Sequence, residues 1–99
     1  MYFAVISTDV ADSLPLRKQV REQHLARLHD LNEQGRLLIA GPHPATDEAN
    51  PEKPAFTGSL VVAEFENLQQ AQAWADADPY IKAGVYEQVV VKPYLKVLP

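Results

Sequence analysis

One histidine in this chain has the surroundings of a residue that transfers protons. His24 lies within a segment, residues 14–34, whose apolar residues recur at the spacing of an α-helix. The residues that share its helical face are Val20, Leu28 and Leu31. An imidazole in that position can act as a general base or a general acid. It can also be a core histidine that only forms hydrogen bonds, and the sequence leaves both interpretations open.

Asp78 is the natural partner for this imidazole. It follows a second helical pattern whose expected buried face carries Leu68, Ala71 and Ala75. A carboxylate there can accept a hydrogen bond from one ring nitrogen, fix the tautomer and stabilise the imidazolium. The alternative is a local role, because aspartate before proline commonly caps backbone amides in turns. Spacing places both groups on a shared side of the fold but does not show that they meet.

Two arginines lie on the same side of the first helix as His24. Arg17 and Arg21 could bind an anionic substrate or clamp a carboxylate. The alternative is pairing with surface carboxylates such as Glu22, which is the more common situation of an arginine.

Further candidates flank a long loop and the end of the second helix. Glycine at a strand end lets the backbone approach a ligand, although it also occurs in turns and bulges. Aromatic side chains such as Tyr80, Trp74 and Tyr86 can stack on a flat ligand or simply fill the core. The expected substrate-binding residues are Arg17, Arg21, Gly41, Pro42, Ser59 and Tyr80.

Composition excludes several other functions. The 99 residues include no cysteine, so disulfides, thiolate metal sites and cysteine nucleophiles are ruled out. His24 and His29 do not share a helical face, and no glycine-rich phosphate loop or dinucleotide motif occurs, so we expect neither a metal nor a cofactor. A net charge of −4 argues against nucleic acid as a partner. No apolar run is long enough to span a membrane and no targeting segment opens the chain, so we expect a cytoplasmic protein.

Four strands and two helices are expected to position these residues. The patterns predict strands over 2–8, 36–41, 57–66 and 85–92, and helices over 14–34 and 68–77. Asp12 or Ser13 should cap the first helix, and Asn67 the second. The segments between them should be a polar connection over 9–13, a proline-rich loop over 42–56, a turn over 80–84 and a tail over 93–99.

This order predicts an α+β fold of the ferredoxin-like kind in a single domain over residues 1–99. A βαββαβ split gives one antiparallel four-stranded sheet with both helices on one face. The strands are apolar on both faces, so something must cover the second face. We therefore expect a homodimer that packs through the open sheet face.

Several stretches make the chain similar to a known family. They are Arg21–Leu28, Gly35–Leu38, Ala40–Pro42, Phe56–Ser59, Ala63–Glu66, Ala71–Tyr80, Ala83–Glu87 and Val91–Pro93. In these stretches the chain resembles the YciI-like, or YCII-related, family of small bacterial proteins. The resemblance implies a dimeric α+β barrel, and it implies that the family's histidine and aspartate fall on His24 and Asp78. Some members are similar to dehydrochlorinases of chlorinated aromatic diols, whereas most have no assigned reaction.

The expected function is proton-transfer chemistry on a small molecule that is anionic or phenolic. His24 would move the proton, and Asp78 would orient the ring and balance its charge. Lyase, isomerase and hydrolase reactions all use such a pair, and the sequence does not choose among them. The alternatives are a protein that binds a small metabolite without turning it over, and a structural or interaction module without a ligand.

Overall fold

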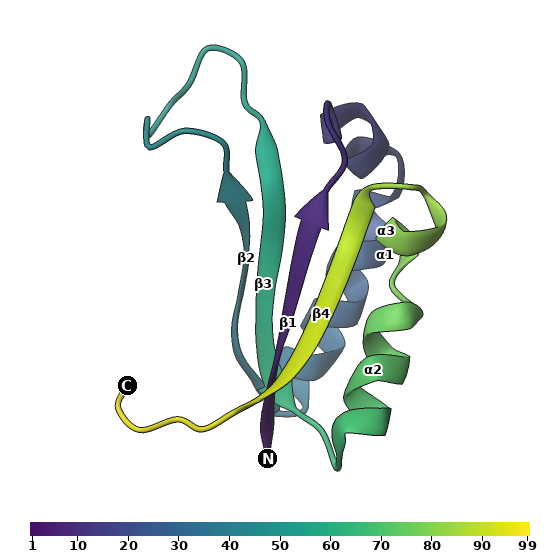
Figure 1. Cartoon of the computed structure of the whole chain (residues 1–99), viewed down its shortest axis with the longest axis vertical. Helices are drawn as coiled ribbons and strands as arrows, with labels where there is room; N and C mark the ends of the chain where they lie inside the picture. Colours follow the sequence, from purple (N-terminus) through teal and green to yellow (C-terminus); the bar gives the residue numbers. More distant parts are fainter.

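The computed structural model describes residues 1–99 and contains one four-stranded sheet and three helices. The elements are β1 (Tyr2–Asp9), α1 (Leu14–Glu33), β2 (Leu37–Pro44), β3 (Phe56–Glu64), α2 (Leu68–Asp76), α3 (Pro79–Lys82) and β4 (Tyr86–Tyr94). The strands lie in the order β2-β3-β1-β4, and every neighbouring pair is antiparallel. Figure 1 shows α1 and α2 on the same face of the sheet, which confirms the expected ferredoxin-like α+β fold. No helix is long and apolar enough to cross a membrane.

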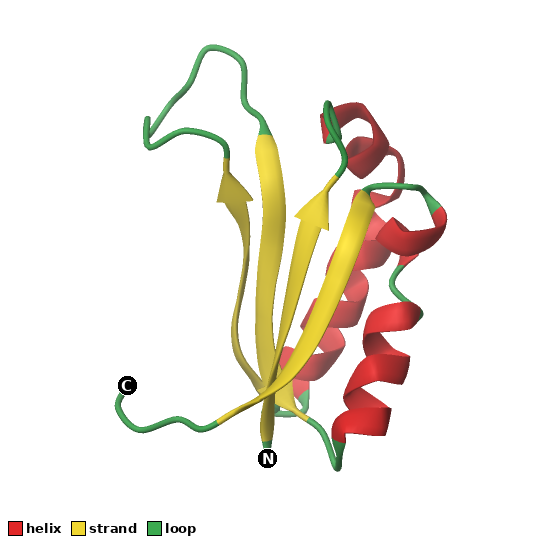
Figure 2. Ribbon diagram, viewed as in Figure 1, coloured by secondary structure: helices red, strands yellow, loops and turns green.

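The core lies between the sheet and the two longer helices. Alternate residues of β1 and β3 point toward the helices, as the period of a strand requires. Their buried apolar members meet Leu31 of α1 and Ala71 and Ala75 of α2. The full cluster is Phe3, Val5, Leu31, Val61, Ala63, Phe65, Ala71 and Ala75. Figure 2 shows this layer of helices on one side of the sheet and the other side uncovered.

The expected proline-rich loop is shorter than the sequence suggests. β2 continues through Pro42 to Pro44, where Pro42 pairs with Ser59 of β3. A proline lacks an N–H, but β2 is an edge strand, where a missing donor on the outer side removes no ladder bond. The same reason explains why β4, the other edge strand, extends past Pro93 to Tyr94.

The helix ends agree with expectation only in part. Asn67 caps α2 as predicted, since its side chain accepts a hydrogen bond from Gln70 N at 2.9 Å. Ser13 stands at the N-cap of α1 but makes no capping hydrogen bond. Leu68, expected on the buried face of α2, is 48% exposed. The turn expected after Asp78 is the one-turn helix α3.

Two register shifts and one kink shape the end of the sheet that carries the site. Opposite β1, the pairing moves from Gln88 at Thr8 to Tyr86 at Asp9, so β4 contains an extra residue. A bulge of this kind reverses the side of the sheet to which the residues beyond it point. Tyr86 therefore lies on the helix side instead of sharing the open side with Gln88. The second shift at this end lies between His43 and Pro44 of β2, opposite Gly58 and Phe56 of β3, and α1 is kinked at Val20. A third shift, between Leu37 and Ile39, lies at the other end of the sheet.

Close approach of two strands explains one glycine. A methyl group added at Gly58 of β3 would meet the backbone carbonyl oxygen of Ser7 in β1. We expect Gly58→Ala to lower the free energy of unfolding by about 1–3 kcal/mol, because the backbone would have to shift. Gly41→Ala is the matched control, since nothing lies within 4 Å of a methyl group there. Urea denaturation measures both variants, and equal stability of the two would contradict this account of Gly58.

Candidate functional site

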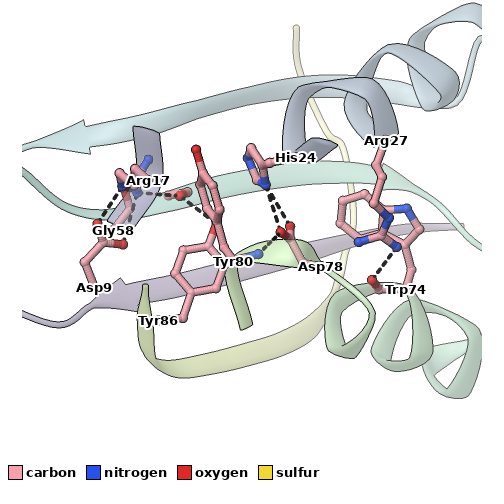
Figure 3. Close-up of polar contacts among 10 residues, drawn as sticks. Asp9, Arg17, His24, Arg27, Gly58, Trp74, Asp78, Tyr80 and Tyr86 are labelled. Atoms are coloured by element: carbon pink, nitrogen blue, oxygen red, sulfur yellow. Dashed lines mark hydrogen bonds and ion pairs between the residues drawn. The ribbon is translucent and has the colours of Figure 1, made fainter. Parts of the chain in front are cut away.

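His24 and Asp78 are in direct contact. Nδ1 of His24 lies 2.9 Å from each of the two carboxylate oxygens of Asp78. Both side chains are buried, with 8% and 7% of their surface exposed. The contact joins α1 to the start of α3, across 54 positions of the chain (Figure 3). Because a carboxylate accepts hydrogen bonds, the pair has Nδ1 as the donor and leaves the other ring nitrogen, Nε2, for a ligand.

The position of Asp78 follows from local rules. Proline at the next position favours an extended backbone at Asp78, which has φ −62° and ψ 130°. Asp78 is the N-cap of α3, and its Oδ1 accepts a hydrogen bond from the backbone N–H of Tyr80 at 2.9 Å. The local capping role and the contact with His24 therefore exist together in one carboxylate, and neither excludes the other.

The phenol ring of Tyr80 packs against the face of the His24 imidazole. The two rings are stacked, with centroids 3.9 Å apart and planes inclined by 4°. The guanidinium carbon of Arg17 lies 5.2 Å from the centre of the same phenol ring, and Figure 3 shows Tyr80 between Arg17 and His24. Tyr86 meets Tyr80 edge-on, with centroids 5.5 Å apart. These contacts fix the orientation of the His24 ring.

Arg17 is the centre of a second buried network. Its Nε donates to Asp9 Oδ2 at 2.7 Å, and its Nη2 donates to Asp9 Oδ1 at 3.0 Å. Nη2 also contacts the carbonyl of Gly58 and the hydroxyl of Ser59, each at 3.1 Å. Ser13 donates its hydroxyl proton to Asp9 Oδ2 at 2.6 Å, so it serves this network instead of the end of α1.

Burial and charge shift three of these groups. Burial alone would lower the pKa of Arg17, but the hydrogen bonds and negative charge of Asp9 outweigh it, so the pKa is raised and the guanidinium stays charged. Burial raises the pKa of Tyr80, and the nearby arginines oppose the effect. Burial raises the pKa of Tyr86 to about 12, so its hydroxyl keeps its proton beside Ser59, 3.1 Å away.

A cavity of about 290 Å³ lies beside these residues. It is lined by Leu14, Arg17, Lys18, Arg21, His24, Leu25, Leu28, Ala40, Gly41, Pro42, Phe56, Ser59, Val61 and Tyr80. Arg27 Nη1 is the one buried side-chain polar atom of the chain without a hydrogen bond. His24 Nε2 also forms no hydrogen bond, but it is not fully buried. Because His24 lines the cavity, we take this nitrogen to be accessible from it.

The structure brings the expected site residues together. All six expected substrate-binding residues and His24 line this one cavity, whereas Asp78 lies behind His24 and does not line it. Arg17 pairs with buried Asp9 and not with Glu22. Arg21 is exposed at the cavity.

The sequence pattern missed two residues of the site, Asp9 and Lys18, and for Tyr86 it suggested stacking on a ligand but not the contact with Ser59. Asp9 falls where a polar connection was expected, although it continues the helix-facing alternation of Phe3, Val5 and Ser7, as a buried residue should. Tyr86 reaches Ser59 only because of the bulge in β4, which no sequence signal marks. Lys18 lines the cavity next to Arg17, and the helical spacing did not single it out.

Two other places on the molecule lack comparable chemistry. A shallower hollow of about 850 Å³ contains Trp74 and Arg36, and Arg36 already donates to the backbone carbonyl of Glu64. Arg27 lies 4.5 Å above the indole of Trp74 and donates to its carbonyl oxygen at 2.7 Å. No three His, Asp or Glu side chains are grouped closely enough to hold a metal ion.

Comparison with known proteins now places the chain. The YCII-related domain matches residues 1–95, and the chain belongs to that family. A protein named YciI from Escherichia coli O6:H1 is 59% identical over 97 residues, which cover 98% of this chain and 99% of the relative. An uncharacterised protein from Haemophilus influenzae is 55% identical over 97 residues, which also cover 98% of this chain and 99% of the relative. These findings confirm the resemblance drawn from the sequence.

A solved structure is also similar over nearly the whole chain. It is 5-chloro-2-hydroxyhydroquinone dehydrochlorinase (TftG) from Burkholderia phenoliruptrix AC1100 in complex with 2,5-dihydroxybenzoquinone. The TM-score is 0.83 at 26% sequence identity, and the match covers 96% of this chain and 94% of that one. The fold around the cavity is therefore shared with an enzyme.

The buried phenol of Tyr86 should make stability depend on alkaline pH. In the unfolded chain a tyrosine releases its proton near pH 10, whereas burial in the fold raises the pKa to about 12. The stability due to the protonated phenol is thus complete below about pH 10 and is lost as the pH rises to about 12, by roughly 2–3 kcal/mol. Urea denaturation at about pH 9 and about pH 12 should show this loss in wild type and a smaller loss in Tyr86→Phe. Parallel losses in the two proteins would be inconsistent with the buried phenol as the cause.

Proposed function

We propose that this protein is an enzyme that moves a proton on a small molecule, with His24 as the group that takes or gives the proton. One observation carries the proposal. His24 Nδ1 lies 2.9 Å from both oxygens of the buried Asp78 carboxylate, while Nε2 is unpartnered at a cavity of about 290 Å³. A histidine that only filled the core would have no reason to present a free nitrogen to a cavity.

The mechanism starts from the tautomer. Asp78 accepts a hydrogen bond from the N–H of Nδ1. Nε2 of neutral His24 therefore carries the lone pair and can accept a proton from a bound molecule. The imidazolium that forms is stabilised by the carboxylate behind it. The stacked ring of Tyr80 keeps Nε2 aimed in one direction, so no reorganisation is needed during the transfer. In the reverse direction the same imidazolium is a general acid.

An elimination reaction is the class that the likeness to TftG supports. That protein is named a dehydrochlorinase, and loss of HCl requires one base to take a proton while chloride departs with its bonding electrons. His24 supplies such a base here. Isomerisation and hydrolysis use the same proton transfer, and they differ in what leaves the substrate.

The residues around His24 have binding roles in this proposal. Arg17, Arg21, Ser59 and Tyr80 contribute polar side chains to the cavity wall, and Gly41 and Pro42 are the part of that wall that β2 contributes together with Ala40. Since Asp78 does not reach the cavity, it positions His24 and does not touch the substrate.

The proposal includes a second copy of the chain on the open sheet face. Ile6, Leu60 and Val90 are side by side on this face through the pairing of β1 with β3 and β4. Ile39 is 52% exposed, and Leu95, Val97 and Leu98 of the tail are 77–80% exposed. Apolar side chains gathered on an uncovered sheet face are typical of an interface between subunits.

Activity of two site variants tests the mechanism. We expect the wild type to release chloride from 5-chloro-2-hydroxyhydroquinone, as measured by ion chromatography, and we expect His24→Gln to remove this activity. Asp78→Asn should lower kcat by a factor of about 10²–10⁴, because the amide keeps the shape but not the charge. Circular dichroism checks that the fold is retained.

His29→Gln is the matched control, because His29 is an exposed histidine on the same helix and does not line the cavity. Its rate should equal that of wild type. Full activity in His24→Gln would refute the proposed base. Saturable binding of the compound without any turnover would favour the metabolite-binding alternative.

Oligomeric state tests the second copy. We expect the wild type to be a dimer by light scattering, and Ile6→Lys to shift it toward monomer, because a charge at the centre of the open face must be desolvated on association. Gln69→Lys, on the exposed side of α2, should leave the dimer intact. A wild type that is monomeric at high micromolar concentration would rule out this arrangement.

A further inference from the structure

The charge around the cavity is opposite to the charge of the chain. The protein has a net charge of −4, with nine lysine and arginine residues and thirteen aspartate and glutamate residues. The cavity is lined by three of those cations, Arg17, Lys18 and Arg21, and by none of the carboxylates. Asp9 and Asp78 lie behind Arg17 and His24, where they hold these two side chains. A bound molecule therefore meets positive groups first.

Arg17 presents one prepared hydrogen-bond donor to this space. Its Nε and Nη2 are held by Asp9, Gly58 and Ser59, whereas Nη1 forms no hydrogen bond within the chain. Nη1 has no partner but is not fully buried, so it is accessible from the cavity that Arg17 lines. A guanidinium held on two sides loses little conformational freedom when its third group binds.

Arg17 and His24 are held at a set separation. They lie on either side of the Tyr80 ring, with the imidazole stacked at 3.9 Å and the guanidinium carbon at 5.2 Å from its centre. Figure 3 shows the hydroxyl of Tyr80 pointing away from Asp78 and Tyr86, and this oxygen forms no hydrogen bond within the chain. A ligand that reaches both ends meets three groups that can donate: Arg17 Nη1, the Tyr80 hydroxyl and, once protonated, His24 Nε2.

We propose that the molecule on which His24 acts carries an oxyanion, either a carboxylate or an ionised phenol, that binds Arg17 Nη1. Lys18 and Arg21, both exposed, draw the anion to the cavity. The inference rests on the proposed function, because it names the substrate class of the same site. The oxyanion lies at the Arg17 end, and the proton that moves lies at the His24 end.

Binding of simple probes tests the substrate class. Benzoate and benzamide have nearly the same shape, but only benzoate is charged, and 4-nitrophenolate replaces the carboxylate by an ionised phenol. Calorimetric titration at neutral pH and low salt should give a Kd for benzoate at least about tenfold lower than that for benzamide. The comparison of benzoate with 4-nitrophenolate tells which oxyanion the site prefers.

Variants locate the binding. Arg21→Gln and Lys18→Gln should each weaken benzoate about threefold to tenfold and leave benzamide unchanged. Lys53→Gln is the control, because it makes the same change in net charge on an exposed loop away from the cavity. Arg17→Lys keeps a positive charge beside Asp9 and so protects the fold, but it removes the free arm, and it should abolish the preference for benzoate.

Each outcome bears on the proposal. Benzamide binding as tightly as both benzoate and 4-nitrophenolate would overturn it. Binding of neither anion at millimolar concentration, or equal weakening of the preferred anion by Lys53→Gln and Arg21→Gln, would also overturn it. His24→Gln should still bind benzoate, since the anion contacts the other end of the cavity. Anion preference without His24-dependent turnover would refute the proposed function alone. Turnover that depends on His24 without anion preference would refute the oxyanion site alone.

Discussion

The rest of the site depends on the hydrogen bonds that the carboxylate of Asp78 accepts. It binds His24 of α1 with both oxygens and caps the first turn of α3 with one of them. A single buried group thus ties together the middle of a long helix and the start of a short one. Because α3 carries Tyr80, the same cap sets the ring that stacks on His24. The orientation of the imidazole follows from contacts that all begin at this residue.

A second buried pair, Asp9 and Arg17, fixes a side chain at the other end of the cavity in the same way. Asp9 leaves the end of β1 and holds Arg17 with two hydrogen bonds. Breaking a buried ion pair by removing one partner commonly costs about 3–5 kcal/mol, so this pair stabilises the fold as well as the wall of the cavity. Both carboxylates lie behind the cationic or imidazole group that they hold. This arrangement leaves the wall of the cavity positive in a protein whose net charge is negative.

The sheet places the two pairs within reach of each other. In the order β2-β3-β1-β4, β1 is a central strand, so Asp9 at its end pairs with Tyr86 of β4, while Ser7 of the same strand pairs with Ser59 of β3. The site therefore takes one residue or more from nearly every element of a small fold. Such a site depends on global folding, because the His24–Asp78 contact spans 54 positions and the Asp9–Arg17 pair joins the end of a central strand to a helix packed on the sheet.

The sequence by itself determined the strand faces, the extent of α1 and the side of the fold on which His24 and Asp78 lie, because periods of 2 and 3.6 residues are local properties. It also carried the family resemblance, which placed the family's histidine and aspartate on the same two residues. Only the tertiary structure decided that the two side chains touch, that Arg17 binds Asp9, and that Tyr86 enters the site. The first two contacts span 54 and 8 positions of the chain, and the third depends on a bulge that reverses the side of one strand end. Register shifts and long-range contacts depend on how the elements pack against one another, and the local pattern of residue types does not encode that packing.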